Sequence, residues 1–238
     1  MADITTPYDA LARNHGIKLV RDTASAIDVD KRQVRLAKGD VLAFDRVIVA
    51  PGIDFMCEAL PEYRPNNKVI DVDVKGNTLK LEIDDIKANV LNVLPPMKAG
   101  NIATAFITAN ERWCEVDWLT YESKVTKGVH LLGDALQIAP AMPKSGHMAN
   151  AHGKACAAAV VALLNNEAPN PSPTLTNTCY SFVSDTQAVH VASVHKYDAK
   201  DKTMKTVLGA GGVSSAMNEL EAAYGLNWAR NIWADTLG

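Results

Sequence analysis

The chain has 238 residues, with 24 Lys and Arg against 27 Asp and Glu, and 47% of its residues are hydrophobic. This length is enough to bury a core in one large domain or two small ones, and the ordinary apolar and charged fractions exclude a disordered or fibrous chain. A net charge of −3 argues against a nucleic-acid binder, which needs a basic face. The longest uncharged apolar run, Ala155–Leu164, is too short for a membrane-spanning helix, so no membrane span is expected.

The first fifty residues predict short strands. Lys18–Ala24 and Ile27–Leu36 have strand composition, and Gly39-Asp40 is a turn signal. Phe44–Ala50 is a β-branched run closed by Pro51-Gly52, which is typical of a parallel strand buried on both faces. The beginning of the chain has no basic or apolar leader pattern, so it does not predict a signal peptide.

The middle of the chain predicts three more strands. Leu79–Asp84 alternates apolar and charged residues, as a half-buried strand does. Val90–Leu94 and Val129–Leu132 are compact apolar runs that predict buried strands. The first ends at Pro95-Pro96 and the second at Gly133-Asp134.

The amino-acid composition changes after the last of these strands. Ser145–Leu164 is rich in alanine and free of proline, so it predicts one long helix with Ser145 as its N-cap. Asn165–Pro173 contains three prolines and cannot continue that helix, so it is expected to be a loop.

The C-terminal part predicts a hairpin and a helix. Thr178–Val194 and Thr203–Leu208 are expected to form antiparallel strands around the charged turn Asp198–Asp201. Asn218–Thr236 predicts an amphipathic terminal helix.

Two of the strand ends share a layout that favours ligand binding. Val47–Gly52 and His130–Ala135 each combine a buried strand with a turn of small residues. Ligands of open α/β sheets lie at the carboxyl ends of strands, and small residues there let the backbone approach closely. Asp134 is placed to accept hydrogen bonds from ribose or ribityl hydroxyls. The alternative is that Asp134 only caps a turn.

The loop that precedes the long helix strengthens the second signal. Ala139–Gly146 leads into the helix start, where free N–H groups and the positive end of the dipole come together. Such a start suits a phosphate or the pyrimidine end of a reduced flavin, and Lys144 would add charge. The simpler interpretation is a capped helix with a solvated lysine.

The cysteines and histidines do not predict a metal site. The cysteines are Cys57, Cys114, Cys156 and Cys179. They are widely spread, with no C-x-x-C pair, so they fit buried reduced thiols or one or two disulfides. His147 and His152 are five residues apart on the predicted helix, which is a poor metal pair. No G-x-S-x-G or H-E-x-x-H motif supports a hydrolase.

Several segments together resemble the flavoprotein subunit of the flavocytochrome c sulfide dehydrogenases, relatives of sulfide:quinone oxidoreductase in the glutathione-reductase group. The segments that carry the resemblance are Tyr8–Ile17, Asp45–Gly52, Leu94–Gly100, Trp113–Asp117, Gly133–Ala135, Met142–Gly146, Asn177–Ser181 and Trp228–Gly238. They are densest from about Val90 to the end.

The resemblance implies an α/β fold in two units. Residues 1–165 would form an incomplete FAD/NAD(P)-binding, glutathione-reductase-like Rossmann-type domain, with a remnant of the central domain at about 64–115. Residues 166–238 would form a C-terminal α+β domain for flavin binding and interface contacts. No G-x-G-x-x-G follows an N-terminal strand, and the first half of the central domain is not found in the sequence. We therefore expect the FAD domain to be incomplete.

The resemblance also implies FAD as the cofactor and a set of residues around it. The residues implied for cofactor binding are Ala50, Pro51, Gly52, Gly133, Asp134, Pro143, Lys144 and Ser145. Asp134 would bind the ribityl–pyrophosphate region, and Trp228 would lie near the isoalloxazine on the electron route. Cys114 matches one cysteine of the family's redox disulfide. Its partner would lie in the missing half of the central domain, so that disulfide is not expected here.

In the family's chemistry sulfide attacks the disulfide, two electrons pass to FAD, and the flavin reduces a c-type haem one electron at a time. The expected function is therefore oxidation of sulfide or related reduced sulfur, with a c-type cytochrome subunit as partner and a periplasmic location. One alternative is a truncated, non-catalytic homologue that docks a cytochrome or serves assembly. Another is a sulfur carrier that acts through Cys114 alone.

Overall fold

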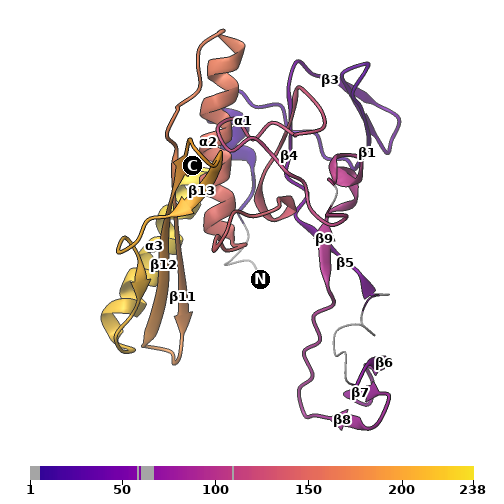
Figure 1. Cartoon of the computed structure of the whole chain (residues 1–238), viewed down its shortest axis with the longest axis vertical. Helices are drawn as coiled ribbons and strands as arrows, with labels where there is room; N and C mark the ends of the chain where they lie inside the picture. The colour runs from indigo at the N-terminus through magenta and orange to yellow at the C-terminus, as the bar shows by residue number, and fades with distance from the viewer. Residues whose placement is uncertain (1–5, 58, 60–66, 109) are drawn as a thin grey trace.

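The computed structural model describes residues 6–57, 59, 67–108 and 110–238 (Figure 1). Its helices and strands are α1 (Asp9–His15), β1 (Ala24–Asp28), β2 (Gln33–Leu36), β3 (Val41–Ala43), β4 (Val47–Val49), β5 (Ile53–Phe55), β6 (Val69–Asp73), β7 (Thr78–Leu81), β8 (Asp85–Lys87), β9 (Met97–Ala99), the 3-10 helix η3 (Asn101–Phe106), β10 (Val129–Leu131), the 3-10 helix η4 (Gly133–Ala135), α2 (Gly146–Leu164), β11 (Thr174–Phe182), β12 (Ala188–Asp198), β13 (Thr203–Thr206), β14 (Gly212–Val213) and α3 (Glu219–Leu237).

The first sheet is an antiparallel meander of β1, β2 and β3. The sequence predicted strands at Lys18–Ala24 and Ile27–Leu36, but the chain is not a strand before Ala24, and the second run is split between β1 and β2. The split has a local cause, because the carboxylate of Asp28 accepts the N–H of Lys31 at 3.1 Å and closes a turn.

The second sheet is the parallel pair of β4 and β10. Both strands fall inside the predicted runs Phe44–Ala50 and Val129–Leu132. Burial on both faces holds for β10, all of whose residues are buried, but not for β4, where Ile48 is 44% exposed. The face of the sheet on which Ile48 lies is therefore not covered at β4.

The central segment forms an antiparallel pair, β5 with β9, and a separate three-stranded sheet, β6-β7-β8. Figure 1 shows this small sheet at the lower end of the molecule, away from the helices. The strand predicted at Leu79–Asp84 is confirmed in shorter form as β7. Pro61–Tyr63, where the missing half of the central domain was expected to join, lies outside the described residues.

The strand predicted at Val90–Leu94 is wrong. These residues form no strand, and Val90 and Leu94 are 77% and 61% exposed. The run has no neighbouring strand to pair with, and Pro95-Pro96 offers no N–H for a ladder at its end.

The C-terminal sheet has the order β11-β12-β13, with β14 also paired to β12. The prediction of one strand over Thr178–Val194 is wrong, because the chain reverses between β11 and β12, where Val183 N donates to Gln187 O at 2.9 Å. The hairpin between β12 and β13 is confirmed. Its turn is closed by Asp198, whose carboxylate accepts the N–H groups of Lys200 and Asp201.

The two long helices are confirmed with their caps. Ser145 accepts the N–H of Met148 at 3.1 Å and starts α2, and Asn218 accepts the N–H of Glu221 at 2.9 Å and starts α3. Only Ala222 and Gly225 of α3 are buried. This helix therefore lies on the sheet of β11 and β12 and leaves most of its length in solvent.

The main core lies where β10, η3, η4, α2 and β11 meet. Its largest fully buried side chains include Tyr121, Phe106, Leu131, Leu136 and Met148. Because Leu175 and Met204 belong to the same cluster, the C-terminal sheet shares its core with the parallel strands.

Among the described residues, no helix combines the length and apolar character needed to cross a membrane. The same residues contain no cluster of three or more His, Cys, Asp or Glu side chains suited to a metal ion.

Candidate functional site

The two predicted strand-end turns lie side by side. Val49 of β4 is in register with Leu131 of β10, and Leu132 N donates to Val49 O at 3.3 Å. The strands are parallel, so both turns leave the same edge of the sheet. Gly52 and Gly133 adopt positive φ angles of +67° and +72°, a conformation that glycine adopts without strain.

The first turn, Pro51-Gly52, is fixed by contact with the residues that follow β9. Gly100 N donates to Gly52 O at 3.1 Å, and a Cβ on Gly100 would lie 2.8 Å from the carbonyl oxygen of Pro51. Glycine is therefore required where the two backbones touch. Ala50 is exposed, whereas Pro51 and Gly52 are half-buried.

The second turn places Asp134 in η4, next to the beginning of α2. A Cβ on Gly133 would meet Ala149 of α2 at 3.5 Å, so the turn lies directly against the first helical turn. The side chain of Asp134 is half-buried, and its carboxylate has no hydrogen bond to any described residue. It is thus free to accept hydrogen bonds from a ligand.

Lys144 bridges this turn and the helix start. Its Nζ donates to the carbonyl oxygens of Asp134 and Leu136, both at 2.6 Å, and lies 3.6 Å from the ring centroid of Trp113. Burial lowers the pKa of Lys144 to about 8, with Asp134 opposing the shift and Arg112 adding to it. Lys144 is therefore neither the solvated lysine of the simpler interpretation nor a free cation. It links two segments of backbone.

Ser145 does more than cap the helix. Its hydroxyl accepts the N–H of Met148 and donates to Oδ1 of Asn177 on β11. Asn177 is buried, so this contact fixes the beginning of α2 against the C-terminal sheet. Pro143 is half-buried just before the cap.

Cys114 lies in the core and has no exposed surface. Its backbone joins the second turn, because Cys114 N donates to Ala135 O at 3.0 Å and Gln137 N donates to Cys114 O at 2.8 Å. Burial raises the pKa of the thiol to about 11, and Lys144 is the charge that opposes this shift. The guanidinium of Arg112, two residues before Cys114 in the sequence, donates to Met97 O.

All four cysteines are free thiols. Cys156 is buried like Cys114, Cys57 is exposed and Cys179 is half-buried beside Asn177. The alternative of intrachain disulfides is therefore not realised.

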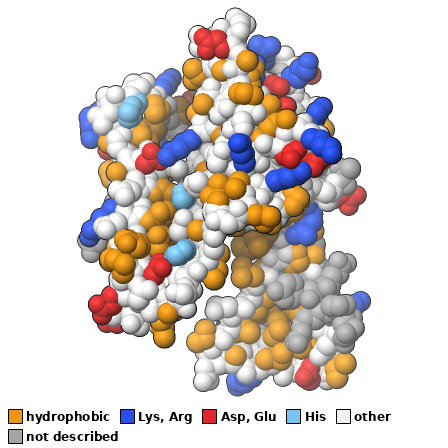
Figure 2. Space-filling view, turned by 60° about the vertical axis from the view of Figure 1, so that its left-hand side comes forward, with side chains coloured by type: hydrophobic (Ala, Val, Ile, Leu, Met, Phe, Trp, Pro, Cys, Tyr) orange, Lys and Arg blue, Asp and Glu red, His pale blue; other side chains and the backbone are white. Residues whose placement is uncertain are grey.

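Trp228 lies on the opposite flank of the α2 start. Its indole meets the His147 ring edge-on at 5.4 Å and lies 6.1 Å from the ring of Tyr180. These three side chains and Tyr224 line a cleft of about 580 Å³ between α2, β11 and α3. Figure 2 shows histidine side chains among hydrophobic side chains on one face of the molecule.

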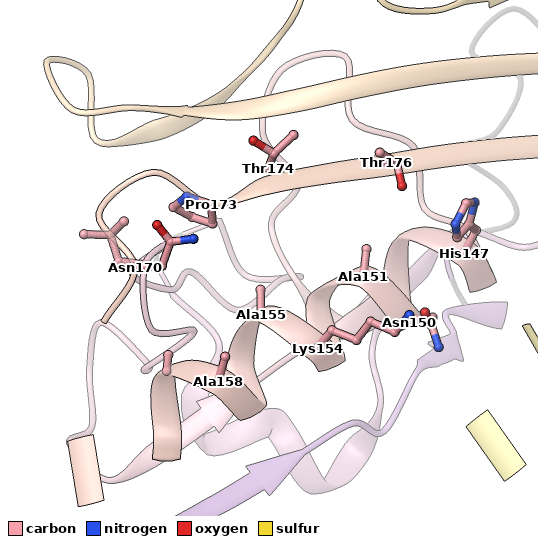
Figure 3. Close-up of a pocket in the computed structure, with 12 residues that line it drawn as sticks. His147, Asn150, Ala151, Lys154, Ala155, Ala158, Asn170, Pro173, Thr174 and Thr176 are labelled. Atoms are coloured by element: carbon pink, nitrogen blue, oxygen red, sulfur yellow. The ribbon is translucent and has the colours of Figure 1, made fainter. Parts of the chain in front are cut away.

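A second cavity, of about 360 Å³, lies between α2 and β11 (Figure 3). His147, Asn150 and Lys154 line both cavities, so they run along one face of α2.

The sequence did not identify four residues that join the expected ones at this site: Trp113, His147, Asn177 and Tyr180. Trp113, Asn177 and Tyr180 lie in segments that carry the family resemblance, and His147 lies in the first turn of the predicted helix, but neither signal assigned these side chains to the site.

Residues 171–237 match the family model described as flavocytochrome c sulphide dehydrogenase, flavin-binding. This match confirms the predicted resemblance for the C-terminal segment and supports FAD as the cofactor.

Solved structures share the fold of nearly the whole chain. The sulfide:quinone oxidoreductase of the hyperthermophilic bacterium Aquifex aeolicus superposes with a TM-score of 0.70 at 12% identity, over 98% of this chain and 78% of that one. Putidaredoxin reductase, in its covalent complex with putidaredoxin, superposes with a TM-score of 0.57 at 11% identity, over 98% and 79%. A chain of the mitochondrial ATP synthase of Tetrahymena thermophila gives 0.58 at 14% identity, over 74% and 70%. At these identities the likeness shows the fold, which is the predicted glutathione-reductase-like fold of FAD-dependent oxidoreductases.

The residues present fit one end of FAD. The positive-φ turns at Gly52 and Gly133 leave the backbone open to close approach, Asp134 has a free carboxylate, and α2 begins beside them. The adenosine end is different, because no strand followed by a glycine-rich turn and helix precedes β1 in the described residues. The described structure therefore fits the ribityl and ring end of FAD, and it lacks the element that would hold the adenosine.

Proposed function

We propose that this chain is an FAD-dependent oxidoreductase of the sulfide dehydrogenase type, which oxidises sulfide or a related reduced sulfur compound and passes electrons to a c-type cytochrome. The observation that carries the proposal is the pair of glycine turns at the ends of β4 and β10, set against the capped start of α2. The flavin-binding model matched by residues 171–237 supports it. A periplasmic location is part of the same proposal.

The protein's own residues would orient the cofactor. Bound FAD supplies the ability to take up an electron pair and to release electrons singly. Asp134 would accept hydrogen bonds from ribityl hydroxyls, and Gly52 and Gly133 would let the backbone approach. The N–H groups in the first turn of an α-helix have no acceptor within the helix. In α2 these groups would face the electron-rich edge of the flavin ring.

Trp228 and Cys114 differ in their accessibility for the proposed chemistry. Trp228 lines an open cleft and is accessible for electron transfer along the aromatic side chains of α3 and β11. Cys114 is covered, and its pKa is raised, so sulfur chemistry at this thiol first requires its Sγ to be uncovered.

The test is direct reconstitution with FAD. The purified chain is incubated with FAD, desalted, and examined for flavin absorbance that remains with the protein. Gly133→Val should abolish retention, because a branched side chain is strained at a φ of +72°. Gly153→Ala on α2 is the control, since a Cβ there meets nothing within 4 Å. No retained flavin on folded wild-type protein contradicts the proposal.

A second candidate is a non-catalytic cytochrome-docking or assembly module. It is favoured by the exposed aromatic side chains of α3, Tyr224 and Trp233. Immobilised chain without flavin should then retain a c-type cytochrome, and Trp233→Ser should weaken that retention. Cytochrome binding that depends on bound FAD favours the first candidate.

A further inference from the structure

One edge of the C-terminal sheet lies beside α2 and is not paired with another strand of the described chain. β11 is the terminal strand of the order β11-β12-β13. Tyr197 N donates to Pro173 O at 3.1 Å and Val183 N donates to Gln187 O at 2.9 Å, so the odd-numbered residues of β11 are bonded to β12. In an antiparallel ladder the alternate residues direct their N–H and C=O groups to the other side. The even-numbered residues of β11 therefore present their backbone groups at the free edge.

A hydrogen bond to His147 shows that the even-numbered N–H groups of β11 point away from β12, and it occupies one of these groups. Thr178 N donates to Nδ1 of His147 at 2.9 Å, from β11 across to α2. The next two outward residues, Thr176 and Thr174, have no backbone partner within the described part of the chain. Both line the 360 Å³ cavity.

The opposite wall of this cavity is made of short side chains. Figure 3 shows Ala151, Ala155 and Ala158 on the face of α2 that is turned to β11, with His147 at the end where helix and strand approach each other. Asn170 and Pro173 lie at the other end. Alanine is short enough to let a second main chain lie close to the helix. The cavity is thus a wedge between a strand edge and a smooth helix face.

The wedge is almost neutral. Lys154 is the only charged side chain among its lining residues, and its ammonium is paired with Asp235 at 2.7 Å, outside the lining. Asn150 is also tied to α3, through a 3.1 Å hydrogen bond to Thr236. The groups left for an occupant are backbone donors and acceptors, hydroxyls and the side-chain NH2 of Asn170, whose Oδ1 already accepts the N–H of Ser172.

We propose that this wedge binds an extended, uncharged segment of a partner polypeptide, which pairs with the edge of β11 at Thr174 and Thr176. Regularly spaced outward N–H and C=O groups are the pattern that strand addition recognises. Because α2 stands beside the same edge, the proposed occupant is a single extended segment, and pairing with a second copy of the sheet is the alternative that the test below distinguishes. This inference does not depend on the proposed redox function.

The first test follows amide hydrogen exchange by NMR. The probe is the capped tetrapeptide Ac-Val-Thr-Val-Thr-NH2, and its control is the same peptide with N-methylated backbone amides. At roughly tenfold excess over its Kd, the first peptide should slow exchange of the Thr174 and Thr176 N–H groups about tenfold. The Thr178 N–H, which is bonded to His147, should not change, and the methylated peptide should have no effect.

Variants of the protein distinguish backbone pairing of the peptide with β11 from binding that only fills the cavity. Thr176→Pro removes an outward N–H without breaking the bonds to β12, so the fold should survive while the peptide affinity falls. Ala155→Leu should block the wedge. Ala157→Leu is its matched control, because Ala157 is exposed on α2 outside the lining.

Three results would overturn the proposal. One is unchanged exchange at Thr174 and Thr176 with saturating peptide, and another is equal binding of the methylated peptide. The third is protection of these amides by raised protein concentration alone, which would assign the edge to a second copy of the chain.

Discussion

The ammonium of Lys144 lies 3.6 Å from the ring centroid of Trp113. The same ammonium donates to the carbonyl oxygens of Asp134 and Leu136, so one side chain joins the Cys114 segment, the η4 turn and the start of α2. Two of these segments, the η4 turn and the start of α2, are ones that the proposed cofactor would touch. Lys144 therefore organises the site by fixing backbone.

Replacing Lys144 tests this positioning role. Lys144→Met keeps the apolar stem but removes the bonds to two carbonyls, and we expect a loss of about 1–3 kcal/mol in the free energy of unfolding. Urea unfolding followed by tryptophan fluorescence measures the loss. Lys144→Arg, which keeps the charge, should recover part of it. Equal stability of the Met variant and wild type would contradict the role.

The buried thiols predict a loss of stability at alkaline pH. Burial raises the pKa of both Cys114 and Cys156 from 9.0 to about 11, so between these values the folded state holds protons that the unfolded state has released. The free energy of unfolding should therefore fall as pH rises from 9 to 11, by on the order of 1–3 kcal/mol for each thiol.

Urea titrations at a series of pH values measure this slope. Cys114→Ser and Cys156→Ser should each flatten it, and Cys57→Ser should not, because Cys57 is exposed. A slope unaffected by the first two variants would show that the thiols are not the groups that titrate.

His152 predicts the opposite behaviour in acid. Its ring is buried against Trp118 and Tyr121, neither ring nitrogen has a hydrogen-bond partner among the described residues, and burial lowers its pKa to about 4. The unfolded state takes up a proton below pH 6.5, whereas the folded state does not until about pH 4. The free energy of unfolding should thus fall by roughly 1–3 kcal/mol as pH drops through this window.

Removing the imidazole tests the assignment. His152→Phe, which fills a similar volume without a titratable group, should weaken the dependence on pH between 6.5 and 4. His15→Phe, on the exposed helix α1, is the control. If both variants keep the wild-type slope, His152 is not responsible.

Local signals in the sequence predicted the elements that position the site. Pro-Gly after a β-branched run predicted β4, Gly-Asp after a compact apolar run predicted β10, and a serine before an alanine-rich segment predicted the start of α2. By contrast, β5 and β9 are three residues long and carry no pattern of their own. They exist because Ile53–Phe55 and Met97–Ala99 pair with each other across a long separation in the sequence.

The environment of single side chains was less accessible to sequence reasoning. Nothing in the neighbourhood of Lys144 shows that its ammonium reaches carbonyls eight and ten residues earlier. Likewise, Arg112 lies two residues before Cys114 in the sequence, but its guanidinium donates to Met97 O. Such contacts depend on how the chain returns on itself, and residue type and spacing do not encode this return.

The contact between Ser145 and Asn177 gives a final prediction about how the start of α2 is joined to the C-terminal sheet. Ser145→Ala removes the cap of α2 and also takes away the hydroxyl that donates to the buried oxygen of Asn177. We expect a loss of about 1–3 kcal/mol in the free energy of unfolding, more than a cap alone contributes. Asn218→Ala, which removes the exposed cap of α3, should cost about 1 kcal/mol. Because the difference comes from Asn177, the double variant Ser145→Ala/Asn177→Ala should lose less stability than the sum of the two single variants. Strict additivity would mean that the helix start and the sheet are not coupled through this pair.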